Sequence, residues 1–159
     1  MTPIEGDLRT IKGKHDDLTA AVIGVFYGVY NELGYGFLES VYREAMRIAL
    51  SAAGLQVEIE VSISVNFRGE VIGIFRADLI VNRVVLNELK SCESLIRQHE
   101  SQTLNYLKAK TIEVALLMNF GPAPKFKRLT MDNEKKSIRS VESVSIGVKP
   151  LAEGGMEWV

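Results

Sequence analysis

Three charged residues interrupt two apolar runs in the middle of the chain. The segment Phe75–Ser91 reads Phe-Arg-Ala-Asp-Leu-Ile-Val-Asn-Arg-Val-Val-Leu-Asn-Glu-Leu-Lys-Ser and contains Asp78, Glu88 and Lys90. Glu88 and Lys90 are two residues apart, so in a strand their side chains point to the same face. Charges on a buried strand face are costly unless they are paired or bind a metal. This cost is the first indication of chemistry in the sequence.

Two carboxylates brought together from adjacent strands form a hard-oxygen site suited to Mg²⁺ or Mn²⁺. The carbonyl of Leu89, between Glu88 and Lys90, is a further candidate ligand. Lys90 beside such a metal could orient or deprotonate a water, while the metal stabilises charge on a phosphate under attack. Hydrolysis of a phosphodiester needs this combination of groups.

The spacing of these charged residues also has a purely structural interpretation. A Glu and a Lys two apart on a strand are typical of a solvated sheet edge, and spacing alone favours that structural explanation. The apolar residues on either side of the charges favour the first reading, as does the Asn82-Arg83 turn that brings Asp78 toward Glu88.

The strands that carry these charges belong to an expected three-stranded meander. Val57–Phe67 alternates strictly between apolar and polar residues, which predicts a strand with one buried face. Arg68-Gly69 is expected to turn it into a second strand over Val71–Val81. The turn at Asn82-Arg83 then leads into a third strand over Val84–Lys90.

Three helices are predicted around this sheet. Apolar residues at three-four spacing predict a helix from Asp16 to Leu33, which Gly34 ends. Within it, Gly24 and Gly28 have two interpretations. They allow close packing against another helix, or they are simply small residues that face a crowded neighbour. The other helices are expected over about 38–53, ended by Gly54, and over about 93–109.

The remaining segments complete an α/β fold. Ile112–Phe120 is continuously apolar and predicts an interior strand, parallel to Val84–Lys90 because a helix precedes it. An edge strand is expected over Phe126–Met131, and a short strand over Val141–Val148. We therefore expect a mixed central sheet with flanking helices. Its divisions are a flexible arm over 1–15, a domain over 16–131 and a tail of low order over 132–159.

Motifs that occur in order along the chain resemble those of a known superfamily. Asp78, then Glu88-Leu89-Lys90 on a hairpin, preceded by Glu39 on a helix, resembles the PD-(D/E)xK nucleases. Within that superfamily the chain is similar to the small bacterial GxxExxY proteins. The quoted matches are Gly36-Phe37-Leu38-Glu39-Ser40-Val41-Tyr42, Phe75-Arg76-Ala77-Asp78-Leu79, Gln102-Thr103-Leu104-Asn105-Tyr106 and the Leu-Leu-Met-Asn-Phe-Gly run at 116–121, and the resemblance spans roughly 16–131.

The resemblance implies a restriction-endonuclease-like core and a role for each matched residue. Asp78 and Glu88 would be metal ligands and Lys90 the catalytic lysine. Glu39 would be a further acidic ligand, directly or through water, although a carboxylate in the first turn of a helix also suits the helix dipole.

Two more matched residues bear on the substrate, and three residues differ from the pattern of the superfamily or of the GxxExxY proteins. Gln102 and Tyr106 would position DNA, as in the Gln-x-x-x-Tyr motif of repair exonucleases, or Tyr106 would simply pack with its hydroxyl bonded to an amide. Ala77 stands where the superfamily name has Pro. Tyr35 and Tyr30 replace the Pro and His often seen in relatives, and none of the three removes a ligand.

Composition sets limits on class and partners. The 159 residues are 47% hydrophobic and 25% charged with a net charge of −1, so no global positive field favours nucleic acid. Residues 108–139 hold eight basic against three acidic residues, enough for phosphate contacts on one face. The single Cys92 suits a reducing compartment. No secretory signal is evident and no run approaches about 18 apolar residues, so we expect a cytoplasmic protein without a membrane span.

Three functions stay open from the sequence. The leading hypothesis is an Mg²⁺- or Mn²⁺-dependent nuclease acting on nucleic acid, with DNA as the expected substrate. The second is a nucleic-acid-binding module that keeps the fold without cleavage, which would not need intact Asp78, Glu88 and Lys90. The third is an interaction or assembly domain that forms a homodimer through its apolar first helix.

Overall fold

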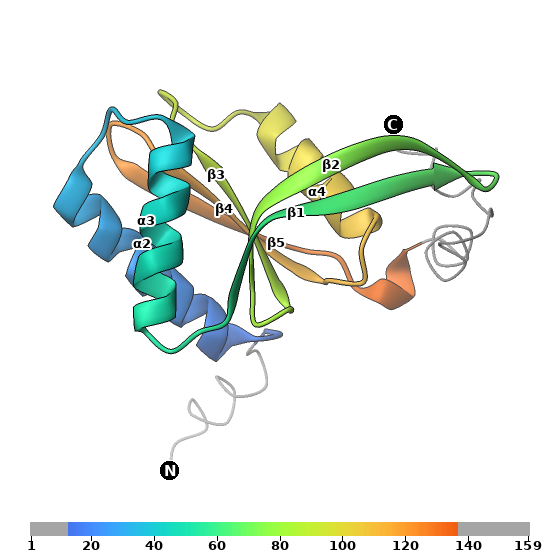
Figure 1. Cartoon of the computed structure of the whole chain (residues 1–159), viewed down its shortest axis with the longest axis horizontal. Coiled ribbons are helices and arrows are strands. Elements are labelled where there is room, and N and C mark those ends of the chain that lie inside the picture. Colours follow the sequence, from blue (N-terminus) through green and yellow to red (C-terminus); the bar gives the residue numbers. More distant parts are fainter. Residues whose placement is uncertain (1–12, 137–159) are drawn as a thin grey trace, which may run out of the picture.

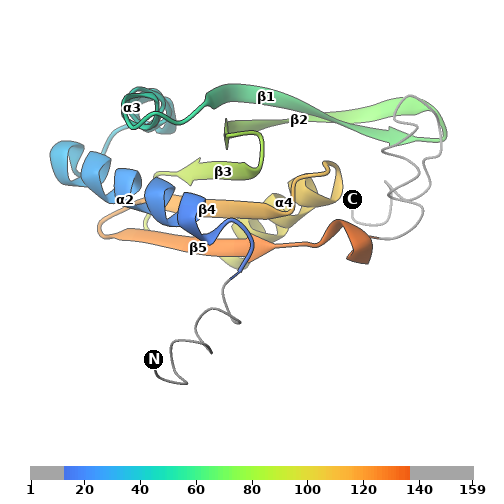
Figure 2. The ribbon, with the colours of Figure 1, turned by 90° about the horizontal axis from the view of Figure 1, so that it is seen from below.

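A computed structural model describes residues 13–136 as a five-stranded sheet with helices on both faces (Figure 1). Helices α2 and α3 cover one face and α4 covers the other (Figure 2). The elements in order are α2 (Asp16–Leu33), α3 (Glu39–Ala52), β1 (Val57–Phe67), β2 (Glu70–Val81), β3 (Val85–Lys90), α4 (Arg97–Lys108), β4 (Val114–Phe120), β5 (Pro124–Thr130) and the short 3₁₀ helix η1 (Asn133–Lys135).

The strands lie in the sheet in chain order, β1-β2-β3-β4-β5. All neighbours are antiparallel except β3 and β4, which run parallel from Val85 opposite Val114 to Lys90 opposite Asn119. The parallel pair requires the crossover that α4 provides. The meander, the parallel interior strand and the edge strand predicted from the sequence are thereby confirmed.

A buried aromatic cluster fixes α2 and α3 on their face of the sheet. The ring of Tyr42 stacks on Phe120 with centroids 4.1 Å apart, and Phe26 meets Phe120 edge-on at 4.9 Å. The apolar stripe of α2, which includes Val22 and Val29, is buried here against the sheet. The stripe is thus used within the fold and is not free as the dimer surface considered above.

The apolar residues of β1 change from one core cluster to the other in the middle of the strand. Val57 packs in the cluster under α2 and α3, whereas Val61 and Ile63 pack in the cluster under α4. In a regular strand these residues would share one face. The break falls at Glu60, whose φ of +48° is a left-handed conformation uncommon for non-glycine residues. The predicted alternation of buried apolar and exposed polar residues holds beyond Glu60, where Ile63 and Val65 are buried. The expectation of one common buried face along the whole strand is wrong.

Helix α4 starts four residues later than the sequence pattern predicts. Ile96 is extended, and its N–H donates to Nδ1 of His99 at 3.1 Å. This bond occupies a backbone donor at the start of the helix. Residues 91–96 consequently form a loop that connects the end of β3 to α4.

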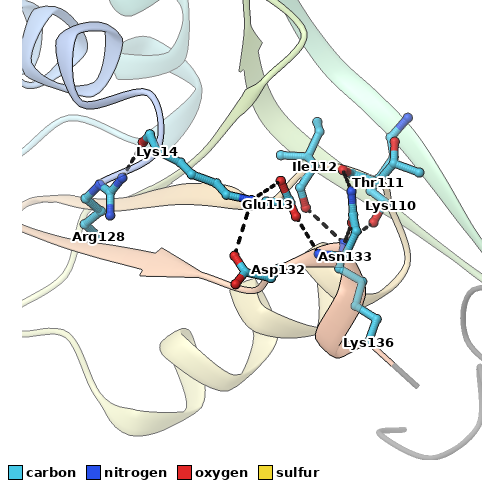
Figure 3. Close-up of polar contacts among 9 residues, drawn as sticks. All are labelled: Lys14, Lys110, Thr111, Ile112, Glu113, Arg128, Asp132, Asn133 and Lys136. Carbon is cyan, nitrogen blue, oxygen red and sulfur yellow. Dashed lines mark hydrogen bonds and ion pairs between the residues drawn. The ribbon is translucent and has the colours of Figure 1, made fainter. Parts of the chain in front are cut away.

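A polar cluster joins residues near both ends of the described chain to the loop before β4 (Figure 3). Lys14 lies 2.9 Å from Glu113 and 3.5 Å from Asp132. The ammonium of Lys136, a buried side chain, donates to the carbonyls of Lys110 and Ile112 and to the side chain of Asn133. The expected strand at 141–148 lies outside the described residues, as do positions 1–12 of the expected arm.

The helix glycines and the apolar character of the helices can be judged from the fold. A Cβ added at Gly24 or Gly28 would meet no atom within 4 Å, so these glycines serve no close helix packing within the described chain. In the same residues, no helix combines the length and apolar character needed to cross a membrane.

Candidate active site at the fork between β2 and β3

Strands β2 and β3 diverge after a short paired stretch (Figure 1), and Asp78 and Glu88 lie just beyond their last paired residues. Their pairing extends only from Val81 opposite Val85 to Leu79 opposite Asn87. Beyond it, the N–H of Leu89 donates to Oδ2 of Asp78 at 2.8 Å, and the N–H of Asp78 donates to Oε1 of Glu88 at 3.0 Å. Each carboxylate thus binds the backbone of the opposite strand. The Asn82-Arg83 turn does bring Asp78 and Glu88 together, as the sequence suggested.

Glu88 is the most perturbed acid of this fork. Only 5% of the residue is exposed, and burial raises its pKa to about 8. The negative charges of Asp78 and Glu39 raise this pKa further, whereas the Asp78 N–H bond and Lys90 act in the opposite direction. The site therefore concentrates carboxylates in an apolar setting that a bound cation would stabilise.

Lys90 ends β3 on the face that carries Glu88, and a buried amide fixes the backbone beyond it. The Cys92 N–H donates to Oδ1 of Asn119 at 3.0 Å, and Nδ2 of Asn119 donates to the Cys92 carbonyl at 3.0 Å. A Cβ at Gly121 would lie 2.4 Å from that carbonyl oxygen, so only glycine fits there. The Asn-Phe-Gly part of the quoted 116–121 motif thus positions the segment that follows Lys90.

Helix α3 contributes one predicted residue and one that the sequence reasoning missed. Glu39 begins the helix, and its charge raises the pKa of Glu88. Arg43 follows one turn later, with Nη1 3.3 Å from Oδ1 of Asp78 and Nη2 3.4 Å from Oε2 of Glu60. The i, i+4 spacing from Glu39, which places both residues on one helix face, was the signal available in the sequence.

Helix α4 supplies a buried tyrosine beside the carboxylates. The Tyr106 ring lies 5.2 Å from that of Phe75, and burial raises its pKa to about 12, with further contributions from Glu88 and Asp78. Gln102, one turn earlier, is exposed to solvent.

His99, in the first turn of α4, also lies near the fork. Burial lowers its pKa, as does the neighbouring charge of Lys90, while Glu39 raises it. Its Nδ1 already accepts the bond from Ile96 that starts α4, so its clearest role is structural.

The donor set of the fork suits a small hard cation. Among residues 13–136, no three His, Cys, Asp or Glu side chains are arranged to hold a metal together. Two carboxylates are nevertheless available, and Leu89 presents its backbone to Asp78. Mg²⁺ is commonly held by one or two carboxylates while it keeps several waters, so this set fits it.

The superfamily follows from a match along most of the chain. Residues 16–129 match the family model described as the PD-(D/E)XK nuclease superfamily. The chain belongs to this superfamily. Its mixed sheet flanked by helices is the restriction-endonuclease-like fold of these nucleases.

Other comparisons add little to this assignment. Among solved proteins, the crystal structure of SSO0001 is similar at 22% sequence identity with a TM-score of 0.48. The alignment covers 67% of this chain and 57% of that one. No curated protein matches the chain. Within a PD-(D/E)XK nuclease, the fork at Asp78 and Glu88 is the candidate active site.

Proposed function

We propose that this PD-(D/E)XK protein hydrolyses phosphodiester bonds of DNA with Mg²⁺ or Mn²⁺ held by Asp78 and Glu88. The observation that carries the proposal is the reciprocal bonding at the fork, which fixes one oxygen of each carboxylate on the opposite strand. The carbonyl of Leu89 and, directly or through water, Glu39 complete the proposed ligand set. We place the protein in the GxxExxY branch and its activity in the cytoplasm.

The other residues of the candidate site also take part in the proposed reaction. A bound Mg²⁺ supplies a more acidic water and stabilises charge on the phosphate. Lys90 orients the attacking water or takes up its proton, from a strand end that Asn119 holds in place. Gln102 and Tyr106 position the DNA from α4. Arg43 would give up its contact with Asp78 to a bound cation and keep its contact with Glu60, which would leave it beside the substrate phosphate.

One observation favours a module that binds nucleic acid without cutting it. Arg43 already provides a positive charge 3.3 Å from Asp78, so the fork is partly neutralised without metal. In such a module the salt bridge would persist, and affinity for DNA would fall steeply with salt while no product forms.

The deciding experiment incubates the purified chain with plasmid, linear duplex, single-stranded DNA and RNA in Mg²⁺, Mn²⁺ or EDTA. We expect cleavage with metal and none with EDTA, and a loss of 10²- to 10⁴-fold in Lys90→Ala, as for removal of a proton-transfer group. Arg47→Ala, which truncates a cation of α3 that pairs with Glu44 and lies outside the basic segment 108–139, is the matched control and should cleave normally.

Calorimetric titration of Mn²⁺ separates the two candidate functions. Asp78→Asn should weaken Mn²⁺ binding at least tenfold if this carboxylate is a ligand. Absence of cleavage on every substrate, together with unchanged Mn²⁺ affinity in Asp78→Asn, would refute the nuclease. Salt-dependent binding without turnover would instead support the module.

A further inference from the structure

The loop before Glu39 exposes apolar side chains at the edge of the candidate site. Leu38 is 76% exposed, and Tyr35 and Phe37 are each almost half exposed. Together with Val41 on the first turn of α3 they form what we call the apolar lip, defined as Tyr35, Phe37, Leu38 and Val41. Grouped exposed apolar side chains, unlike scattered ones, mark contact surfaces.

Hydrogen bonds hold the lip rigid from within its own loop. The Phe37 N–H donates to the Tyr42 hydroxyl at 3.3 Å, and that hydroxyl donates to the Gly34 carbonyl. The Phe37 ring also meets the Tyr42 ring edge-on at 5.9 Å. Gly36 has a φ of +123°, which a residue with a side chain rarely adopts. The two exposed rings are therefore presented in a fixed arrangement, with little ordering left for a ligand to impose.

The lip is also tied to the segment that leaves the active site. The Ser91 hydroxyl donates to the Phe37 carbonyl at 2.7 Å, and Ser91 directly follows Lys90. The Tyr35 hydroxyl donates to Glu93 at 3.4 Å, on the same connection to α4. On its other side, Leu38 immediately precedes Glu39. The loop of the lip is thus joined directly to Glu39 and, through Ser91, to the segment that follows Lys90.

The geometry points to unpaired bases of the substrate strand as the occupant of the apolar lip, with Phe37 as the stacking residue. This inference rests on the proposed function and specifies its substrate as nucleic acid with unpaired bases at the site. A strand whose phosphate lies at the fork must carry its neighbouring bases past adjacent surfaces. Flat aromatic rings accept any base by stacking, so the lip would bind without sequence preference.

The test compares two ligands of equal charge, a dT20 strand and a 20-unit strand in which every nucleotide lacks its base. Binding is followed by fluorescence anisotropy in Mg²⁺, with Lys90→Ala as the non-cleaving background. We expect Phe37→Ala to weaken dT20 binding about 5- to 100-fold, the range for loss of one stacked base. Binding of the baseless strand should change less than twofold, and Phe37→Tyr should behave like the parent.

Phe126→Ala is the matched control, because Phe126 is another partly exposed ring that packs against Tyr27 on the side of α2 and β5. It should leave dT20 binding unchanged. Equal loss of both ligands in Phe37→Ala, or loss of neither, would overturn the inference. So would a dimer in sedimentation that Leu38→Asp dissociates without affecting dT20 binding, since the lip would then be a protein interface.

Failure of this inference can be told from failure of the proposed function. If the intact protein neither binds nor cuts any nucleic acid, the function and the lip assignment are both wrong. If the intact protein cuts DNA and Phe37→Ala binds and cuts dT20 equally well, only the lip assignment is wrong.

Discussion

Replacing Glu88 by Gln should stabilise the metal-free protein at neutral and alkaline pH while removing metal binding. Glutamine keeps the size and an oxygen acceptor for the Asp78 N–H, but it carries no charge. The buried carboxylate has a pKa of about 8, against its usual value of 4.5. The folded state therefore holds a proton that the unfolded chain has released throughout this interval.

The sign and size of the effect follow from this difference. Because the folded state binds more protons between pH 4.5 and 8, the free energy of unfolding falls as pH rises through that window. At 1.36 kcal/mol for each pH unit, the whole interval amounts to about 5 kcal/mol. We expect Glu88→Gln to match the parent near pH 5 and to exceed it by up to this amount at pH 8.

The assay is urea unfolding in EDTA at half-unit steps from pH 5 to 9, for the parent, Glu88→Gln and Glu70→Gln. Glu70 is exposed at the start of β2, so its variant should follow the parent curve. The difference between the parent and Glu88→Gln removes the contribution of other titrating groups. A difference that stays constant with pH would show that the pKa of Glu88 is unperturbed and would refute the reasoning. With saturating Mn²⁺ the parent should become more stable than Glu88→Gln, because the Glu88 carboxylate binds the ion and the glutamine amide does not replace it.

Two further predictions concern folding away from the carboxylates. Gly121→Ala should destabilise the protein by about 1–3 kcal/mol in urea unfolding, because the added Cβ would press on the Cys92 carbonyl. Gly24→Ala, on an open helix surface, should stabilise the protein by up to about 1 kcal/mol. Equal effects of the two substitutions would contradict the packing argument. Burial lowers the pKa of Lys136 from 10.5 to about 8, so the folded state loses this proton at a lower pH than the unfolded chain does. The free energy of unfolding should therefore rise with pH between these values, by up to about 3 kcal/mol relative to Lys136→Met. A difference that is flat from pH 8 to 10.5 would contradict the burial of this ammonium.

Much of the architecture was accessible from local patterns in the sequence. The turns at Arg68-Gly69 and Asn82-Arg83 adopt positive φ at all four residues, as polar and glycine pairs in tight hairpins do. The continuous apolar run of β4 predicted an interior strand because such strands are buried on both faces. The Asn82-Arg83 turn, together with the apolar residues around the charges, suggested that Asp78 and Glu88 meet.

Features that depend on packing between distant segments were not predictable in this way. The left-handed backbone at Glu60 has no signature in a strictly alternating segment. The salt bridge of Arg43 with Asp78 and Glu60 joins α3 to two strands, and helix spacing shows only its side of the helix. The later start of α4 comes from one bond between His99 and Ile96 that periodicity does not reveal.

The reciprocal bonds at the fork also bear on ion selectivity. Asp78 Oδ2 and Glu88 Oε1 each accept a backbone N–H, and Oδ1 of Asp78 also lies 3.3 Å from Nη1 of Arg43. Calcium is often bound through both oxygens of a carboxylate and takes six to eight ligands, whereas Mg²⁺ takes six in an octahedron and keeps several waters. Under the proposed function, a cation bound through both oxygens of either carboxylate would compete with these backbone N–H bonds, so the fork would favour Mg²⁺ over Ca²⁺.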